Sequence, residues 1–432
     1  TSTMTELILK PITAIRLECP TAANVFAFIR NHQLYSIDRA EASTYADLFR
    51  FLNSGFAVLV LDGADSALVF GIQGYDKRSV SEPSGEDNVM GAKDGFIEVV
   101  RVNMSLLRRR MKTPQLKLEL FVKGSKSQTD LCLCYMADRV PQSLIAQIKA
   151  RLDEMELESI LSSGYLQPFL ENRRGCLFDT VGTTQRPDVL CAKLLEGRVG
   201  LLIDGTPFAL VIPKLFCESF QTMDDYCYRP AYATLVRWIK YAAFLVAVLL
   251  PALYVAIALH HPELLNRTLL LILADAEENA PISLTAEAIG VLLVYEIIRE
   301  AGLRLPKAVG GAVSIVAGLI IGDAAVASGL ISTPMLTVTA IAVIAGFVVP
   351  DLAQSITLLR LAFLLIAGFW GLFGISLLGA AVLFNLCAGE SFGFPITAPI
   401  APLYKKGFRD TLTRVSFRKM QSGSFTVEEY HE

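Results

Sequence analysis

The sequence lacks the residue combinations that mark most metal sites and catalytic centres. None of its four histidines has a cysteine or histidine partner at zinc-site spacing, and its eight cysteines contain neither a CxxC pair nor a disulfide-framework spacing. A phosphate-binding loop, a dinucleotide-binding fingerprint, a nucleophile elbow and an HExxH helix are absent as well. We therefore assign no catalytic, cofactor-binding or metal-binding residue, and we expect that the protein is not an enzyme.

An excess of positive charge is also missing. The 39 lysine and arginine residues stand against 42 aspartate and glutamate residues, and the net charge of -3 gives no reason to expect nucleic acid as a partner. The first 30 residues have no basic start followed by an apolar core, so they do not indicate a secretory signal. We expect the N-terminal region to lie in the cytoplasm.

Apolar residues, by contrast, are abundant. Hydrophobic residues make up 53% of the chain, its mean hydropathy is +0.47, and the excess is concentrated after Arg237. An α+β cytoplasmic region followed by an all-α membrane domain with several crossings is therefore expected. We expect an N-terminal α+β subdomain (1–90), a second α+β region (91–230), a transmembrane helical domain (231–404) and a basic cytoplasmic tail (405–432).

Two segments of the α+β region follow one pattern. Gly55–Phe70 and Gly197–Ile212 each read as strand, Asp-Gly turn and strand, and a helix-like stretch precedes each of them. Asp62 and Asp204 of the two turns are 142 residues apart, which indicates two related hairpin-containing units. Independent hairpins with the same turn chemistry are the alternative.

A middle block separates these two units. We expect a helix at Phe96–Arg110, a hairpin of Lys117–Val122 with Thr129–Met136, and a helix at Pro141–Met155. The alternation of helices and strands favours a mixed sheet covered by helices. The arginines at 108–110 either bind lipid phosphates or a partner's acidic groups, or are a solvated helix end.

Four apolar runs in the C-terminal half are interpreted as membrane spans. They are Trp238–Leu259, Ala308–Leu330, Met335–Val349 and the run from Arg360 to Cys387. Basic residues at the start of the first span and in the tail favour the cytoplasmic side, so the number of crossings is expected to be even.

Small residues recur at every fourth position of Ala308–Leu330. They are Gly310, Ser314, Gly318 and Gly322. Such a face lets helices pack closely in lipid, and the carboxylate of Asp323, which follows it, must face protein or water. We expect a helix that packs against copies or partners beside a polar path. A tightly packed bundle with an inert aspartate is the alternative.

Pro281–Leu305 combines apolar residues with a group of charges. The charged residues are Glu287, Glu296, Arg299 and Glu300. Glu296 and Glu300 lie on one helix face, and Arg299 is placed to pair with either of them. We expect that this stretch crosses the membrane, lies at its surface or lines an aqueous cavity.

Seven blocks of the sequence occur in a recognisable order. They are SGY (Ser163–Tyr165), TQRPD (Thr184–Asp188), LLEGRV (Leu194–Val199), DGTPF (Asp204–Phe208), EIIREAGLRLP (Glu296–Pro306), IIGDAAVASGLIS (Ile320–Ser332) and FGFPITAPIAPL. In this order, over about Gly91 to Arg414, they resemble the A subunits of bacterial spore germinant receptors. The same family includes a VAF-type sporulation paralogue. The sequence lacks the long hydrophilic N-terminal tail of many receptor A subunits, and this favours the paralogue.

The resemblance implies a membrane subunit of a spore germination receptor rather than a catalyst. It implies a transporter-like B subunit and a lipid-anchored C subunit (a lipoprotein) as partners, membrane lipid around the helices, and the inner membrane of the spore as location. Copies of the A subunit would form a homo-oligomeric ring that conducts monovalent cations when germinant is recognised. The N-terminal domain and the C-terminal tail would be cytoplasmic.

Two departures from the family pattern stand out. The usual glutamate of the TQRPD block is Gln185, so any role of that acid is lost, and the usual Pro-Phe-Pro is Ala280-Pro281-Ile282.

Three functions follow as hypotheses. In a channel, the small-residue face would pack near the pore, and Asp323 or Glu296 would attract cations. A non-conducting scaffold would instead pass on a partner's signal. A transporter ranks last, because the sequence lacks two visibly related membrane halves.

Overall fold

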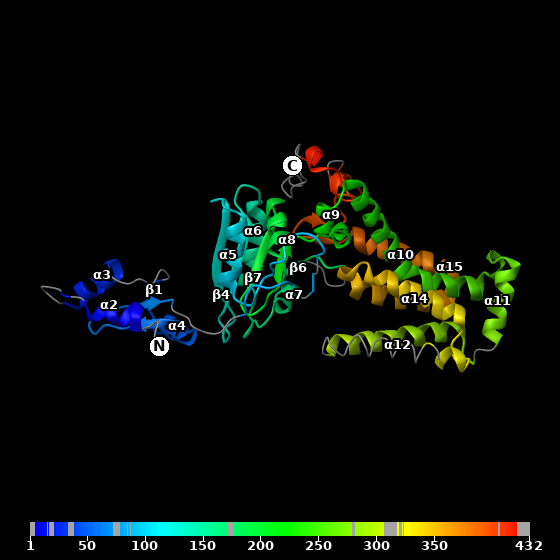
Figure 1. Ribbon diagram of the computed structural model, residues 1–432, viewed down its shortest axis with the longest axis horizontal. Coiled ribbons are helices and arrows are strands. Elements are labelled where there is room, and N and C mark those ends of the chain that lie inside the picture. Colours follow the sequence, from blue (N-terminus) through cyan, green and yellow to red (C-terminus); the bar gives the residue numbers. More distant parts are fainter. Residues whose placement is uncertain are drawn as a thin grey trace.

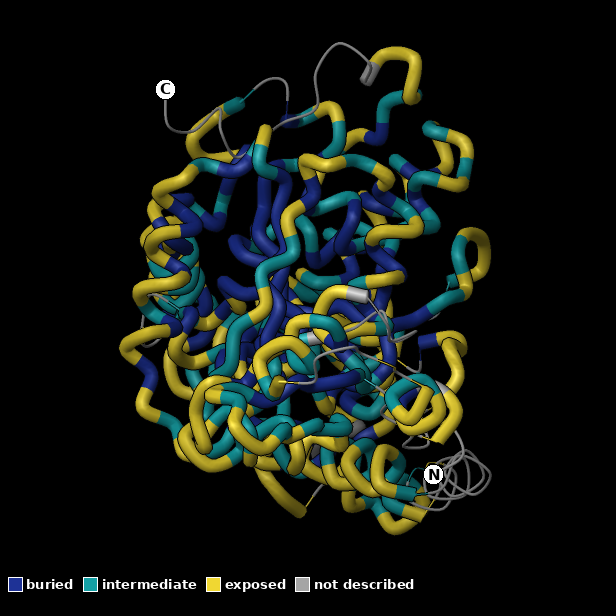
Figure 2. Tube along the Cα trace, turned by 90° about the vertical axis from the view of Figure 1, so that its left-hand side faces the viewer, coloured by how far each residue is buried: buried dark blue, intermediate teal, exposed yellow. Residues whose placement is uncertain are grey.

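The computed structural model of the chain has an α/β N-terminal part and a helical C-terminal part (Figure 1). Buried residues gather in the interior of each part, and exposed ones line the outer helix faces and loops (Figure 2). The described residues are 5–14, 16, 21–32, 39–71, 78–83, 85–86, 88–171, 176–278, 281–305, 318, 322, 324–404 and 407–420.

A three-stranded antiparallel sheet in the order β1-β3-β2 is the centre of the first unit. The helix α4 packs on one face through Leu48 and Phe51, and α3 packs on the other through Ile29. The Thr44 side chain accepts a hydrogen bond from the Asp47 backbone N–H and so starts α4. The elements are η1 (Thr5–Leu9), α2 (Lys10–Thr13), α3 (Ala22–His32), β1 (Arg39–Ala42), α4 (Tyr45–Asn53), β2 (Ala57–Leu59) and β3 (Ala67–Phe70).

The second unit contains a five-stranded sheet in the order β4-β5-β7-β8-β6. Every neighbouring pair of strands is antiparallel, so the expectation of a mixed sheet is wrong. Hairpins join β4 to β5 and β7 to β8, and the two strands of a hairpin run in opposite directions. The elements are α5 (Val100–Arg110), β4 (Leu116–Lys123), β5 (Thr129–Met136), α6 (Gln142–Asp153), η2 (Ser163–Tyr165), α7 (Gln167–Leu170), β6 (Gly182–Thr184), α8 (Pro187–Leu195), β7 (Val199–Ile203), β8 (Ala209–Ile212) and η3 (Phe216–Phe220).

The two units have the same topology at the interval that the sequence indicates. The elements of the first unit correspond to those of the second as β1 to β6, α4 to α8, β2 to β7 and β3 to β8. The corresponding strands are neighbours in the same order, β1-β3-β2 in the first sheet and β6-β8-β7 in the second. The register is also the same, because Ala42 pairs with Ala67 as Thr184 pairs with Ala209. The turn glycines Gly63 and Gly205 have φ angles of 80° and 86°, which glycine adopts without strain.

The helical part is built around α10, which packs against α14 and α15. Two helices of the described residues are long and apolar enough to cross a membrane, Pro230–His260 and Pro350–Cys387. Thr333–Phe347 is apolar but shorter, and Ala308–Leu330 lies largely outside the described residues, so four crossings remain a prediction. The elements are α9 (Asp224–Cys227), α10 (Pro230–His260), η4 (Pro262–Leu264), α11 (Arg267–Glu278), α12 (Leu284–Arg304), α14 (Thr333–Phe347), η5 (Pro350–Leu352), α15 (Ala353–Cys387), β9 (Glu390–Ser391), β10 (Phe394–Pro395), η6 (Gly407–Asp410) and α16 (Phe417–Met420).

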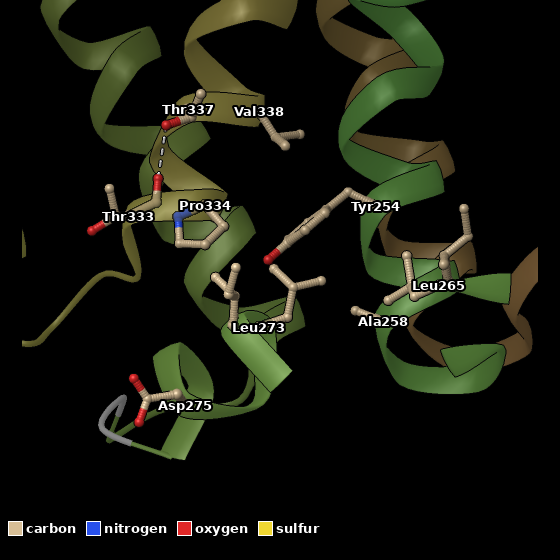
Figure 3. A pocket seen from close by; sticks show the side chains of 11 residues that line it. Tyr254, Ala258, Leu265, Leu273, Asp275, Thr333, Pro334, Thr337 and Val338 are labelled. Carbon is tan, nitrogen blue, oxygen red and sulfur yellow. Dashed lines mark hydrogen bonds between the residues drawn. The ribbon is translucent and has the colours of Figure 1, made fainter. Parts of the chain in front are cut away.

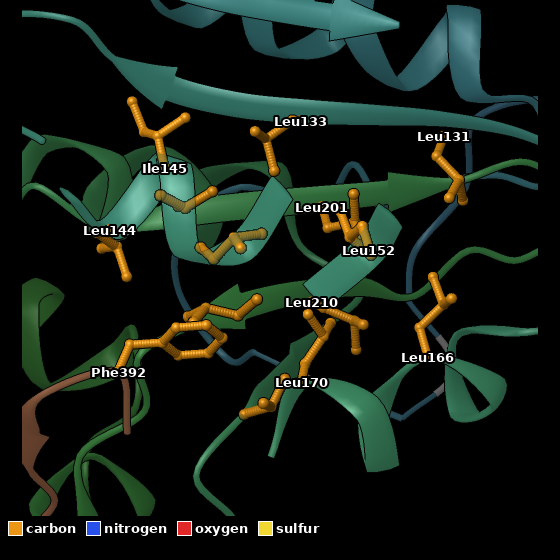
Figure 4. Close-up of a cluster of buried hydrophobic side chains, with 14 of the residues drawn as sticks. Leu131, Leu133, Leu144, Ile145, Leu152, Leu166, Leu170, Leu201, Leu210 and Phe392 are labelled. Carbon is orange, nitrogen blue, oxygen red and sulfur yellow. The ribbon is translucent and has the colours of Figure 1, made fainter. Parts of the chain in front are cut away.

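The chain returns to the α/β part after α15. Phe392 and Phe394, each 1% exposed, join the hydrophobic core between the second sheet and α6, where Phe392 is visible in Figure 4. Arg151 lies over the Phe392 ring, 4.2 Å from its centroid. The segment that follows α15 is therefore anchored in the core of the α/β part.

Candidate functional site

A buried cluster of charges lies where α10 leaves the α/β part. Arg237, which is fully buried, donates from Nε to Asp225 Oδ2 over 2.8 Å and lies with Nη1 3.0 Å from Asp410 Oδ1. Lys240 lies 3.5 Å from the other oxygen of Asp225. We call Asp225, Arg237, Lys240 and Asp410 the junction cluster. It joins α9 and the following helix α10 to η6, which is far away in the sequence.

Aromatic side chains enclose the junction cluster. The Tyr226 hydroxyl donates to Asp410 Oδ2 over 2.7 Å, and burial, followed by the negative charge of Asp410, raises the pKa of Tyr226. The guanidinium of Arg414 stacks over Phe417 at 4.4 Å and lies over Tyr226 at 5.5 Å. Part of the basic tail therefore packs against the start of α10.

A second buried network supports η3, the segment just before α9. The carboxylate of Glu218 forms ion pairs with Arg198 and Lys193. Both of these basic residues also pair with Glu196. Burial alone would raise the pKa of Glu218, but the positive charges of Arg198 and Lys193 outweigh it and lower that pKa to about 2. Because its carboxylate stays charged, the network holds η3 against the second sheet.

The TQRPD block is held by a carboxylate from another part of the chain. Glu86 accepts hydrogen bonds from the Thr184 hydroxyl at 2.8 Å and from the Gln185 backbone at 2.9 Å. Burial raises the pKa of Glu86, although these two hydrogen bonds oppose it. Arg186 pairs with Asp188 at 2.7 Å. Gln185 replaces the family's acid, and Glu86 supplies a carboxylate next to it.

The four charges expected to cluster on α12 are separated in the structure. Arg299 pairs with Glu296 at 2.6 Å, and Glu296 also accepts a hydrogen bond from Thr357 of α15 at 3.0 Å. Glu300 instead pairs with Arg304 on the exposed side of the helix. Glu287 lies nine residues before Glu296, at the other end of α12.

Glu287 is 1% exposed and bonds to the start of α14. Its Oε1 accepts the Ser332 backbone N–H at 2.7 Å and the Ser332 hydroxyl at 2.8 Å. Ser332 is the N-cap of α14, so Glu287 lies at the positive end of that helix dipole.

Arg360 lies in the middle of the helical part and ties three helices together. Its guanidinium donates to the backbone oxygens of Ala247 (α10) at 2.7 Å and Ala342 (α14) at 3.1 Å. The side chain is 3% exposed. A Cβ on Gly346 would come within 3.2 Å of Arg360, so this glycine makes room for the charge.

Of the small-residue face, the structure describes Gly318 and Gly322. No described heavy atom lies within 4 Å of a Cβ built on Gly318, whereas one on Gly322 would touch Leu336 at 4.0 Å. Gly310, Ser314 and Asp323 lie outside the described residues.

A pocket of about 610 Å³ lies between α10, α11 and the first turns of α14 (Figure 3). Its lining is mostly apolar and includes Tyr254, Leu273 and Pro334, with Asp275 at one edge. Within the described parts of the chain, no group of three or more His, Cys, Asp or Glu side chains could hold a metal ion.

The sequence did not single out the junction cluster or Arg360. Asp225 and Asp410 are 185 residues apart, and no local pattern pairs them. Arg360 resembles a residue at the start of a span, but α15 begins seven residues earlier. The signal in the sequence that could have indicated the role of Arg360 was a charged residue among apolar ones. The arginines at 109 and 110 both pair with Asp94.

The chain was compared with known proteins. The model of the family described as Bacillus/Clostridium GerA spore germination protein matches residues 1–424. Spore germination protein KA of Bacillus subtilis (strain 168) is 39% identical over 380 residues, covering 87% of this chain and 70% of that protein. Spore germination protein GerLA of Bacillus cereus is 32% identical over 375 residues, covering 86% and 76%.

One solved structure is also similar in sequence. It is the N-terminal domain of the A subunit of the Bacillus megaterium spore germinant receptor GerK3, which is 38% identical and covers 28% of this chain and 97% of that one. The TM-score of this match is 0.24.

Proposed function

Because the chain belongs to the GerA family of spore germination proteins, we propose that it is the A-type membrane subunit of a germinant receptor. Copies of it would assemble into a cation-conducting channel that releases ions when germinant is recognised. Its partners would be a transporter-like B subunit and a lipoprotein C subunit. Its location would be the spore inner membrane, with the α/β part and the tail in the cytoplasm. A VAF-type accessory channel protein is the variant of this function within the same family.

The observation that carries the channel proposal is the charge retained inside the helical part. Glu287, Glu296 and Arg360 are buried or half-buried there, and charged groups at such depth are costly and commonly serve function. Cation-selective pores use rings of carboxylates, which an oligomer of this chain would form from one acid per copy. Asp323, beside the small-residue face, is the proposed carboxylate.

Gly318 supports assembly through the same face. Nothing described in its own chain fills the space beside it, so a neighbouring copy could approach its backbone closely. In the proposed oligomer, Gly310, Ser314, Gly318 and Gly322 form the contact between copies, with Asp323 beside the ion path.

The junction cluster supports signal transfer from the cytoplasmic side. Arg237 binds carboxylates from η6 and from α9, which follows the last element of the α/β part in the chain. A movement of the α/β part that shifts α9 would therefore be transmitted to α10. The proposed signal path runs from the α/β part through this cluster to the helices.

The test is ion flux from liposomes that contain the purified chain. Asp323→Ala and Gly318→Leu are compared with wild type, and Gly379→Leu is the control because a Cβ on Gly379 also meets no described atom within 4 Å. We expect flux in wild type and in Gly379→Leu, and its loss in the other two variants. Normal flux in both Asp323→Ala and Gly318→Leu would contradict the path along 308–330.

A wild-type chain that never conducts, even with its B and C partners present, would contradict the channel. If that chain still bound the B subunit, it would be a non-conducting scaffold that transduces the signal.

A further inference from the structure

One oxygen of the Glu287 carboxylate has no hydrogen-bond partner among the residues that the structure describes. Oε1 accepts two hydrogen bonds from Ser332, but Oε2 is buried and makes no hydrogen bond to any described atom. A buried polar atom without a partner costs free energy, so in a folded protein it points to something that satisfies it.

Both hydrogen bonds to Glu287 reach Oε1, and both come from Ser332 at the start of α14. The positive end of the α14 dipole stabilises a negative charge there. Neither donor reaches Oε2, which stays without a hydrogen-bond partner among the described atoms.

A small positive ion beside Oε2 would supply the partner that this oxygen lacks. The ion pairs found on α12 involve Glu296 and Glu300, and no described lysine or arginine forms an ion pair with Glu287. We propose that Glu287 Oε2 binds a small monovalent inorganic cation, Na⁺ or K⁺, between α12 and the N-terminus of α14.

The charge of the ion follows from the chemistry of the donors. Divalent cations in proteins usually take several carboxylates, and the described residues hold no group of three or more His, Cys, Asp or Glu side chains that could bind a metal ion. One carboxylate neutralises one positive charge, and the remaining ligands would be neutral oxygens and water.

The pocket gives this end of α14 an opening. Thr333, Pro334 and Thr337 line it, and Thr333 directly follows Ser332, to which Glu287 is bonded (Figure 3). The pocket therefore ends one residue away from the serine that Glu287 binds.

The site is tested by thermal unfolding of the purified full-length chain in detergent. The chloride salts of Na⁺, K⁺ and N-methyl-D-glucamine are compared at constant ionic strength and at two pH values. In wild type we expect Na⁺ or K⁺ to raise the midpoint by about 2 °C in a saturable way. Glu287→Gln keeps an oxygen for Ser332 and should lose this response. Glu300→Gln, which removes an exposed acid of the same helix, should keep it.

Equal unfolding midpoints of the wild-type chain in all three salts would overturn the proposal. Because this comparison uses the wild-type chain alone, it tests the proposal even if Glu287→Gln does not fold. A response retained in Glu287→Gln would overturn it too. A midpoint that depends on pH but not on the cation would mean that Glu287 binds a proton instead. The readout needs neither conduction nor assembly, so its failure is separate from failure of the channel proposal.

Discussion

Arg237 and Asp225 form a buried ion pair, with 2.8 Å between Nε and Oδ2 and side-chain exposures of 0% and 2%. It joins the short helix α9 to α10. Because Asp410 binds the same guanidinium, the pair fixes three segments at one point. The position of α10 relative to α9 and η6 thus depends on a few charges whose desolvation must be compensated by each other.

Asp225→Asn is expected to destabilise the chain by about 3–5 kcal/mol, because it leaves the buried Arg237 short of one negative charge. The matched control is Glu300→Gln, which breaks an exposed pair with Arg304 and should cost about 0–1 kcal/mol. Thermal unfolding of both variants in detergent measures the difference. Equal effects of the two substitutions would mean that the junction cluster does not stabilise the chain.

The Glu218 network predicts a loss of stability in acid. The pKa of Glu218 is lowered in the folded chain from an ordinary 4.5 to about 2, so its contribution is complete above pH 4.5 and falls as the pH drops toward 2. Its size is on the order of 3 kcal/mol. Unfolding measured between pH 6 and pH 3 should show this decrease, and Glu218→Gln should show a smaller one. An identical pH dependence in the variant would rule out Glu218 as the group responsible.

Gly371 interrupts α15 with φ 57° and ψ -144°, angles that only glycine adopts readily. A Cβ there would also come within 2.9 Å of the His260 side chain, whose ring nitrogen lies 3.0 Å from the Gly368 carbonyl. Gly371→Ala should therefore cost about 1–3 kcal/mol. Gly379→Ala on the same helix meets no described atom and should be close to neutral or slightly stabilising. Thermal midpoints of the two variants that agree within error would show that the break carries no strain.

The repeated units predict different effects at corresponding positions. Leu190 of α8 is fully buried beside α5, while Leu48 of α4 is only partly buried. Leu190→Ala should cost about 2–5 kcal/mol, and Leu48→Ala clearly less. Unfolding of each variant in denaturant tests this. A larger loss for Leu48→Ala would mean that the first unit is covered more completely than its exposure indicates.

Several elements of the fold could be predicted because their signals are local. The Asp-Gly turns between apolar runs predicted both hairpins, and the proline and charge pattern predicted α5, α6 and α8 within a few residues. The interval of 142 residues predicted that the units share a topology, and the strand registers agree with it. The antiparallel arrangement of the second sheet was not predicted, because strand order depends on how distant segments pair.

The sequence by itself determined which family the chain belongs to, which segments are helices and strands, and where apolar residues begin to dominate. These depend on hydrophobic periodicity, turn chemistry and block order, which adjacent residues carry. Only the tertiary structure decided that Arg237 meets Asp225 and Asp410, that Glu86 binds the Thr184 hydroxyl and the Gln185 backbone, and that Glu287 binds Ser332 rather than joining Arg299. The physical reason is that a charge withdrawn from water is stabilised by whichever groups the packed chain brings within hydrogen-bonding distance, and sequence separation carries no information about that distance.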